Sequence, residues 1–384
     1  MAPRILFWTS LILLAYTFLG YQLLISLLAR LRQRPAPRTA PPTARPAVLI
    51  VAHNEETRIR SRIENLRATP FPLDIAVCSD GSSDSTAAQA RLAGARVFDF
   101  PIRRGKAACL SDAIPALDAS IVVLTDCRQQ FTPDTIPLLL RHFADPSVGA
   151  VSGLLRVGDP STAAGAGIDL YWKMETALRQ AESDFDSCIG CTGAVYAIRR
   201  PQFCPIPSDT TLDDVVIPMQ IAQTHRILYD NKAQAFDPQP LDPRAETRRK
   251  ARTLAGNFQM LFRHPSWLLP WKNRLAWQLI SHKYLRLAGP FTLLCILASN
   301  AFLLRIPFFR ACFALQLLLY LAAAIGLAFP TLRIRLFSIP AGFLFLNLMT
   351  IRGLLRFLLA PPAGAWDSHP QSREKPTTAV EHKG

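Results

Sequence analysis

The stretch AVLIVAHNEE, residues 47–56, is an apolar run that ends in polar residues and leads into a helical stretch. The same pattern returns in LDIAVCSDGSSDST, residues 73–86, where Asp80-Gly81 ends the strand and the next polar residues can cap a helix. A third apolar run, SIVVLTD, covers residues 120–126. Strands that alternate with helices in this way predict an α/β fold with a mostly parallel sheet and helices on both faces.

The polar residues that follow these strands are predicted to share one edge of the sheet. In open α/β sheets, ligands bind beyond the carboxyl ends of the strands. An acid at a strand end is well placed to hold a metal or a phosphate-bearing ligand, although Arg128 stands where a second carboxylate would follow Asp126. The residues selected by this rule are His53, Asn54, Glu55, Asp80 and Asp126.

The chain of 384 residues has room for about two domains but is not one uniform soluble globule. Residues 5–29 contain no charge, and a helix of that length reaches roughly 37 Å, enough to cross a hydrocarbon core of about 30 Å. A cleaved signal peptide fits less well, because the run is long and its basic cluster comes after it. We therefore predict a transmembrane helix over residues 1–30, followed by a Pro- and Arg-rich linker over residues 31–46.

Arginines set the predicted orientation of this span. Only Arg4 precedes the apolar run, whereas four arginines follow it within the next ten residues. The positive-inside rule then places the N-terminus outside and the following domain, residues 47–253, in the cytoplasm. The four arginines are Arg30, Arg32, Arg34 and Arg38.

The C-terminal third is again membrane-like. Apolar stretches at 287–304, 311–329 and 336–351 predict two or three transmembrane segments within residues 287–360. The last stretch is interrupted by Pro340 and could span the membrane, re-enter it or lie in the interface. Tryptophans mixed with basic residues before these stretches predict interfacial helices over residues 254–286, and the polar tail, residues 361–384, is predicted to be disordered.

The net charge of +15 suggests an anionic partner, and nucleic acid is one candidate. Much of the excess lies beside the predicted spans, where arginines meet lipid head groups, and no nucleic-acid recognition motif accompanies it. Membrane lipids are therefore expected as partners and nucleic acid is not. Eight cysteines in a cytoplasmic setting predict free thiols. Cys188 and Cys191 form one C-x-x-C, but no second pair or nearby histidine completes a zinc site.

Six motifs in chain order resemble the motif set of family 2 glycosyltransferases. The resemblance is closest to the membrane-embedded group of cellulose, hyaluronan and poly-N-acetylglucosamine synthases, and it covers about residues 47–285. It implies a GT-A-type, Rossmann-like nucleotide-sugar domain flanked by transmembrane helices. The motifs are AHNEE (52–56), SDGSSDST (79–86), RRGKA (103–107), TDCR (125–128), GCTGAVYAIRR (190–200) and LDDVVIP (212–218).

The resemblance implies roles on the donor side. Asp126 corresponds to the carboxylate that holds Mg²⁺ or Mn²⁺, and Asp80, with residues 53–55 beside it, to the aspartate that contacts the nucleoside. Turn chemistry is the other interpretation of Asp80. Lys106 opposes the dipole of the helix it begins, which makes sense if an anion binds nearby, although a solvated surface lysine is the alternative. Many relatives have D-x-D where this chain has Asp126-Cys127-Arg128; one carboxylate could still hold the ion, or Arg128 could itself meet a phosphate or an acidic sugar.

Further motifs point to the acceptor and the leaving group. Direct displacement needs a base, and by the resemblance Asp214 is that general base, with Asp213 orienting it or starting a helix. Residues 246–257 stand in place of a Q-x-x-R-W motif: the arginine is kept as Arg252, and the glutamine and tryptophan are missing. Arg249 and Arg252 are expected to bind the leaving diphosphate, unless they belong to a basic membrane-proximal helix. The resemblance places Gly193 on the acceptor side, where it allows close approach.

The sequence thus predicts a multi-pass inner-membrane enzyme, an inverting hexosyltransferase with a cytoplasmic catalytic domain. Its donor would be a nucleoside diphosphate sugar, with UDP-sugars favoured, and its acceptor a polysaccharide or a lipid-linked sugar, with a possible export partner. Two alternatives stay open. One is a glycolipid enzyme that adds a single sugar; the other is a non-catalytic membrane subunit that binds nucleotide sugars.

Overall fold

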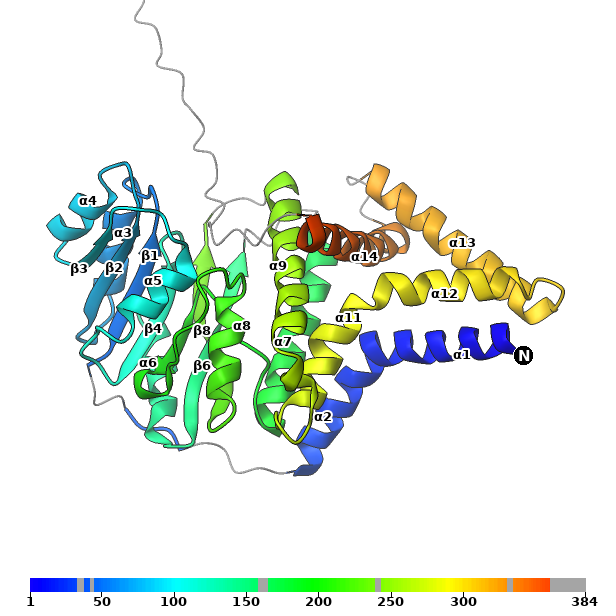
Figure 1. Cartoon of the computed structure of the whole chain (residues 1–384), viewed down its shortest axis with the longest axis horizontal. Coiled ribbons are helices and arrows are strands. Elements are labelled where there is room, and N and C mark those ends of the chain that lie inside the picture. The colour runs from blue at the N-terminus through cyan, green and yellow to red at the C-terminus, as the bar shows by residue number, and fades with distance from the viewer. Residues whose placement is uncertain (33–37, 42–44, 158–164, 239–242, 330–333, 360–384) are drawn as a thin grey trace, which may run out of the picture.

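A computed structural model describes residues 1–32, 38–41, 45–157, 165–238, 243–329 and 334–359. The predicted disordered tail, 361–384, and half of the predicted linker lie outside the described residues. Figure 1 shows a sheet with its covering helices on one side and a group of long helices on the other. Helices α7, α9 and α11 lie between these two parts.

The sheet has eight strands in the order β3-β2-β1-β4-β7-β6-β8-β5. Strands β1 to β4 run parallel, β6 and β8 are parallel to each other, and β7 is antiparallel to both β4 and β6. The predicted mostly parallel sheet is therefore confirmed. The strands are β1 (Ala47–Ala52), β2 (Asp74–Asp80), β3 (Arg96–Phe100), β4 (Ile121–Asp126), β5 (Gln130–Phe131), β6 (Val148–Val157), β7 (Tyr196–Arg199) and β8 (Arg226–Asp237).

The unbroken run of apolar residues in β1 explains why this strand lies in the interior of the sheet. All six of its residues are buried, as expected of a parallel strand covered on both faces. Val48 and Ile50 pack into one core, and Leu49 and Val51 into the other. The helices of this domain are α3 (Ile59–Arg67), α4 (Thr86–Leu92), α5 (Lys106–Ala113), α6 (Thr135–Leu140), α7 (Gly165–Phe185), α8 (Asp213–Ile221) and α9 (Pro243–Arg263).

Strand register brings the predicted polar edge together. Val51 pairs with Asp126 on one side of β1, and Ala52 pairs with Ser79 on the other. His53, Asp80 and Asp126 therefore lie at the same end of three adjacent strands. The strand order reverses at β1, since β2 and β4 lie on opposite sides of it, and this is where ligands bind in such sheets.

Three helices are long and apolar enough to cross a membrane: Ala2–Arg32, Pro307–Ala328 and Arg335–Leu359. The first comprises α1 (Ala2–Ala15), a π-helical turn and α2 (Tyr21–Arg32); the others are α13 and α14. The predicted stretch at 287–304 forms α12 (Gly289–Ala301), which is shorter. Between α9 and α12 lie α10 (Ala276–Leu279), the π-helical turn η5 (Ile280–Tyr284) and α11 (Leu285–Leu287).

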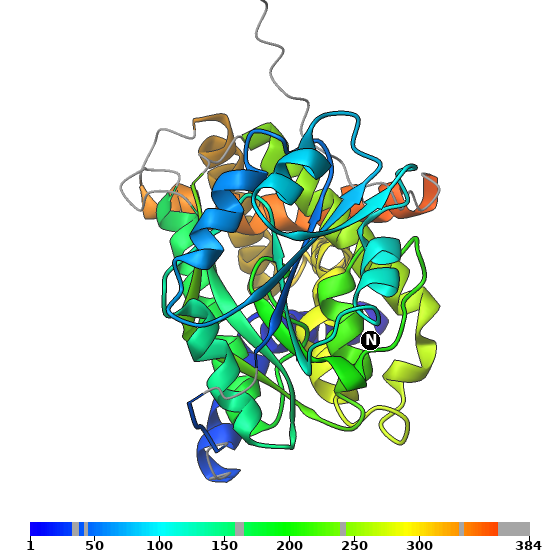
Figure 2. The ribbon, with the colours of Figure 1, turned by 90° about the vertical axis from the view of Figure 1, so that its left-hand side faces the viewer.

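Helix α14 lies differently from the other apolar helices. In Figure 1, α1 and α12 run side by side away from the sheet, whereas α14 points along the line of sight; in Figure 2, α14 runs across the picture. It therefore lies crosswise to α1 and α12. It packs on α9, where Gly353 lies against Leu254 and Phe357 stacks on Phe262. The predicted boundary at residue 253 falls inside α9, which is one continuous helix.

Candidate active site

The loops after β1 and β2 are tied to each other at the sheet edge. His53 Nδ1 lies 2.7 Å from the carbonyl oxygen of Asp80, and Asn54, whose φ is 54°, accepts a hydrogen bond from the backbone of Ser83 at 2.9 Å. Glu55 forms an ion pair with Arg58 at 2.9 Å. The structure thus brings the predicted residues 53–55 and Asp80 together as one bonded loop pair.

Asp80 is fully buried and holds the loop that leads to α5. Its two carboxylate oxygens accept hydrogen bonds from the backbone amides of Arg104 and Gly105, at 2.7 and 2.9 Å. The next residue, Gly81, has φ +61°, and a Cβ there would meet the Arg103 backbone at 2.3 Å. These contacts set the position from which Lys106 projects. Contact with a nucleoside stays a prediction for Asp80.

Lys106 bridges two acids that are far apart in the sequence. Its Nζ lies 2.8 Å from Asp126 at the end of β4 and 3.5 Å from Asp213 at the start of α8. Burial opposes the charge, but the Asp126 and Asp213 carboxylates outweigh it and raise the pKa of Lys106. The alternative of a solvated surface lysine is therefore wrong. We call Lys106, Asp126, Asp213 and Asp214 the acid–lysine cluster.

Asp214 has the electrostatics expected of a base. Burial and the neighbouring Asp213 carboxylate raise its pKa to about 6, against the opposing charges of Lys106, Arg179 and Lys283. A carboxylate with such a pKa is ionised at neutral pH and accepts a proton more readily than an ordinary aspartate.

Gly193 lies directly against Asp214, and its place on the acceptor side stays a prediction. A Cβ at Gly193 would stand 2.9 Å from Oδ2 of Asp214. The loop is held there because the backbone amide of Cys191 donates to the carbonyl oxygen of Asp214 at 2.7 Å, and Gly190 supplies a φ of +73°. Only a residue without a side chain leaves this carboxylate undisturbed.

Helix α9 presents one face to the segment before the acids. Gln259 accepts a hydrogen bond from the backbone of Thr211 at 3.0 Å, and a Cβ at Gly256 would meet Leu212 at 2.6 Å. Arg252 precedes Gly256 by four residues and therefore lies on the same stripe of the helix. Arg249, one turn earlier, forms an ion pair with Glu246, its Nε lying 2.8 Å from the carboxylate.

Arg128 faces β8. Its guanidinium pairs with the buried Asp237 at 2.5 Å. Among the described residues, no three His, Cys, Asp or Glu side chains gather as a metal site. The eight cysteines are free, as predicted, and burial raises the pKa of both Cys188 and Cys191.

A second polar group, between α7 and η5, was not predicted from the sequence. Glu175, Glu182 and His282 are buried together there, with Arg179 beside them. Acids seven residues apart on one helix were the available signal, but their partner is about a hundred residues further along the chain.

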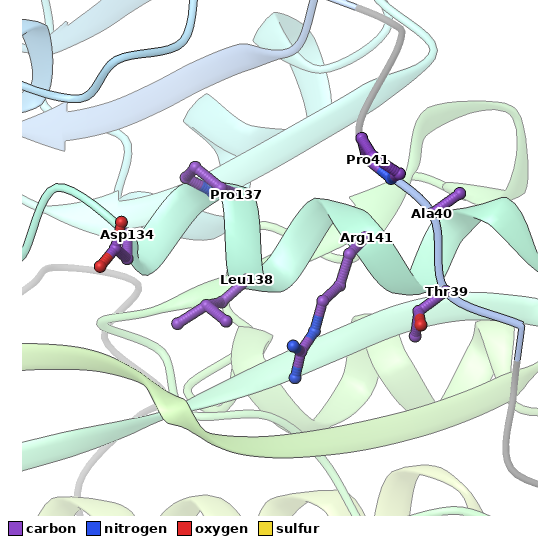
Figure 3. A pocket seen from close by; sticks show the side chains of 7 residues that line it. All are labelled: Thr39, Ala40, Pro41, Asp134, Pro137, Leu138 and Arg141. Atoms are coloured by element: carbon purple, nitrogen blue, oxygen red, sulfur yellow. The ribbon is translucent and has the colours of Figure 1, made fainter.

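A surface cavity of about 420 Å³ lies away from the acid–lysine cluster. Figure 3 shows it between the segment at residues 39–41 and α6, with Arg141 pointing into it. Arg141 forms an ion pair with the buried Asp230 at 2.7 Å, so its guanidinium stabilises the fold at this position. None of the predicted site residues lines this cavity.

Part of the chain is similar to known proteins. Residues 47–203 match the model of the glycosyl transferase family 2. Over 95 residues the chain is 35% identical to a dolichyl-phosphate hexose transferase of Haloferax volcanii, covering 24% of this chain and 41% of that relative. It is 28% identical over 117 residues to protein RfbJ of Shigella flexneri, covering 30% of this chain and 90% of that relative. The chain thus spans less than half the length of the first of these relatives.

The whole fold is similar to a solved structure. The mannosyltransferase PcManGT from Pyrobaculum calidifontis, solved in complex with GDP-Man and Mn²⁺, aligns with a TM-score of 0.67 at 22% identity. The alignment covers 92% of this chain and 99% of that one, so the likeness includes the apolar helices. Together, the family match and this fold support a glycosyltransferase. Residues 47–203 thus resemble the glycosyl transferase family 2, and the fold of the chain is GT-A-like.

Proposed function

We propose that the protein is an inverting glycosyltransferase that moves a sugar from a nucleoside diphosphate sugar to a saccharide or lipid-linked acceptor. The observation that carries this proposal is the acid–lysine cluster at the carboxyl end of β4. There Lys106 joins Asp126 to Asp213, and the adjacent Asp214 has a pKa raised to about 6. The mannosyltransferase fold supports the same class of reaction.

In the proposed reaction the acceptor hydroxyl attacks the anomeric carbon from the side opposite the diphosphate. A new carbon–oxygen bond forms while the bond to the diphosphate oxygen breaks, and that electron pair leaves with the diphosphate. Asp214 accepts the hydroxyl proton. Because attack and departure lie on opposite faces, the configuration at the anomeric carbon inverts.

On the donor side, cations are arranged for a diphosphate. Lys106 belongs to the acid–lysine cluster, and Arg252 lies on the α9 face that contacts the segment before Asp213. We assign the diphosphate to these two, with Arg249 next to them. His53, Asn54, Glu55 and Asp80 form the edge assigned to the nucleoside. UDP-sugars remain the favoured donors, and GDP-mannose enters the test because PcManGT was solved with it.

Asp126 would hold Mg²⁺ or Mn²⁺. Its side chain is 26% exposed at the strand end, and one carboxylate is enough for an ion that takes its other ligands from diphosphate and water. A bound ion would neutralise the charge that develops on the diphosphate. Lys106 already occupies one Asp126 oxygen at 2.8 Å, so lysine and ion would share this carboxylate.

The proposed placement is in the inner membrane with the catalytic domain, 47–253, in the cytoplasm. The helix Ala2–Arg32 would cross with its N-terminus outside, since arginines gather after it. Segments 254–286 would lie at the interface, and two or three segments within 287–360 would complete the multi-pass anchor. Membrane lipids are then partners, and an export partner belongs to the polysaccharide version of the proposal, as in the cellulose and hyaluronan synthase group.

The proposal is tested with membranes that contain the full chain, incubated with labelled UDP- and GDP-sugars, with and without Mg²⁺ or Mn²⁺. Transfer of label to lipid or polymer is expected. Asp214→Asn should abolish transfer and keep donor binding, whereas Asp118→Asn, at an exposed acid outside the site, should change neither. Unchanged transfer by Asp214→Asn would refute the assigned base.

Two alternatives have their own outcomes. Arg128, paired with Asp237 where relatives carry a second carboxylate, favours a non-catalytic subunit that binds nucleotide sugars; donor binding without any transfer would establish it. A glycolipid enzyme would add one sugar per acceptor, and the length of the labelled product separates it from a polymerase.

A further inference from the structure

A second surface cavity, of about 320 Å³, lies between α9 and α14. Three arginines from the two helices line it, and no acidic residue is among the described residues around it. The lining residues are Thr247, Arg248 and Ala251 of α9 and Arg352, Leu355 and Arg356 of α14. A cleft lined by one sign of charge attracts ions of the opposite sign, so this arrangement indicates an anionic ligand.

The acid in α9 is paired away from the cavity. Glu246 forms ion pairs with Arg249 and Lys250, at 2.5 and 3.2 Å, and α14 contains no acid at all. Arg248 and Arg352 are exposed, and neither forms an ion pair with the described residues. Their guanidinium groups can therefore bind an anion from outside the protein.

The arginines of the cavity lie at the border between two faces of α14. The inner face packs on α9, where Gly353 lies against Leu254. The outer face exposes a row of apolar side chains at spacings of three and four residues, which we call the apolar row: Leu348, Ile351, Leu355 and Leu358. At 3.6 residues per turn, Arg352 and Arg356 lie one turn apart between the apolar row and the inner face.

The direction of α14 places this border at the membrane surface. Figures 1 and 2 show α14 crosswise to α1 and α12. Because the helix Ala2–Arg32, which includes α1, is proposed to cross the bilayer, α14 then runs along the bilayer, although its length and composition permit a span. A helix in this position inserts its apolar face among the acyl chains and keeps its basic side chains at the level of the phosphates.

We propose that Arg248, Arg352 and Arg356 bind the head-group phosphate of an anionic membrane lipid, with the apolar row of α14 in contact with acyl chains. The inference rests on the proposed membrane placement and goes beyond the proposed reaction, because this lipid is neither donor nor acceptor. A guanidinium can donate two parallel hydrogen bonds to phosphate oxygens. Leu355 belongs both to the cavity lining and to the apolar row, so the acyl chains of a lipid held here meet an apolar surface.

The test measures binding of a fluorescent phosphatidylglycerol, and of the matching phosphatidylcholine, to the full-length protein in a zwitterionic detergent. We expect phosphatidylglycerol to bind more tightly. The double variant Arg248→Gln/Arg352→Gln should weaken phosphatidylglycerol binding about tenfold or more and leave phosphatidylcholine binding unchanged. Arg352→Lys, which keeps the charge and loses the planar fork, should weaken it less than Arg352→Gln.

The matched control is Arg310→Gln/Arg335→Gln, which removes two exposed arginines of α13 and α14 that do not line the cavity. Its change in net charge equals that of the cavity variant. Because exposed charges are screened by salt over about 8–10 Å, it should weaken phosphatidylglycerol binding by less than about twofold. Thermal unfolding of all variants checks that each is folded.

Three results would overturn the inference. One is equal affinity of the wild-type protein for the two lipids, and another is an equal loss of affinity in the cavity and control variants. The third is displacement of phosphatidylglycerol by inorganic phosphate at the same concentration as by the lipid itself, which would assign the cavity to free phosphate.

Sugar transfer is measured separately, so the two proposals can fail independently. Transfer without arginine-dependent lipid binding contradicts this inference and leaves the proposed function intact. Arginine-dependent lipid binding without transfer from any donor supports this inference and contradicts the proposed function alone.

Discussion

At the scale of single residues, the environment of Asp214 makes a pH prediction. Its pKa of about 6 results from burial and from Asp213, opposed by Lys106, Arg179 and Lys283. The base must be ionised to accept a proton, so kcat/KM should fall as the pH drops through about 6 and reach a plateau above it. The measurement is a pH–rate profile of sugar transfer.

The variant Asp213→Asn tests whether Asp214 is the group that titrates in this profile. Asp213→Asn removes the like charge next to Asp214, so the acid limb of the profile should move to lower pH. A limb that stays in place in this variant would mean that a different group titrates. Donor binding measured across the same pH range controls for changes in affinity.

Gly193 supports a second prediction at this scale. A methyl group there would meet Oδ2 of Asp214 at 2.9 Å, so Gly193→Ala should displace the carboxylate and lower kcat by about 10- to 100-fold. Gly342→Ala, where a Cβ meets nothing within 4 Å, is the matched control. Steady-state kinetics with a saturating donor measure the effect; equal rates for the two variants would refute it.

At the scale of elements, the contact between α7 and η5 depends on one histidine. His282→Leu leaves Glu175 and Glu182 buried without their shared partner, so we expect a loss of about 3–5 kcal/mol in the free energy of unfolding. Unfolding in detergent by denaturant or heat measures it. His225→Leu, at a partly exposed ring bonded to Thr224, should cost about 1 kcal/mol or less. A similar cost for both variants would show that the ion pairs of His282 do not stabilise this contact.

The positions of the acids and of Lys106 at the ends of helices and strands also determine how these side chains come together. Asp126 is at the end of a strand, Asp213 at the start of α8, and Lys106 at the start of α5. Each stands at the terminus of a rigid element, so its position is set by packing of that element rather than by a flexible loop. The α9 face with Gly256 and Gln259 then fixes the segment that precedes Asp213.

At the scale of the whole molecule, cysteine exposure tests the orientation in the membrane. Of the eight cysteines, Cys204 is the exposed one, and it lies in the sheet domain. A membrane-impermeant thiol reagent should therefore label Cys204 only after the cells are permeabilised. A cysteine introduced at Ala2 should be labelled in intact cells, because the N-terminus is placed outside. Labelling of Cys204 in intact cells would reverse the topology.

The strands β1, β2 and β4, and the polar edge they share, could be predicted from local sequence. Local rules suffice there: apolar runs of strand length end in residues such as Asp80-Gly81, and parallel strands align their carboxyl ends. The apolar lengths likewise indicated the candidate spans. For the acids near α8, the order of the motifs was enough to name Asp213 and Asp214, and the structure places Asp213 beside Lys106.

Which charged side chains pair with one another could not be predicted from the sequence, because it depends on how the elements pack. The contact of Lys106 with Asp126 and Asp213, the pairing of Arg128 with Asp237, and the pairing of His282 with Glu175 and Glu182 all join residues at least 20 positions apart. The composition of α14 likewise does not predict that it lies crosswise to α1 and α12. That composition is typical of a transmembrane span and of an interfacial helix alike. The physical reason is that the hydrophobic periodicity of a segment shows which face of that helix or strand is buried. A pairing of charges depends instead on how several elements pack against one another.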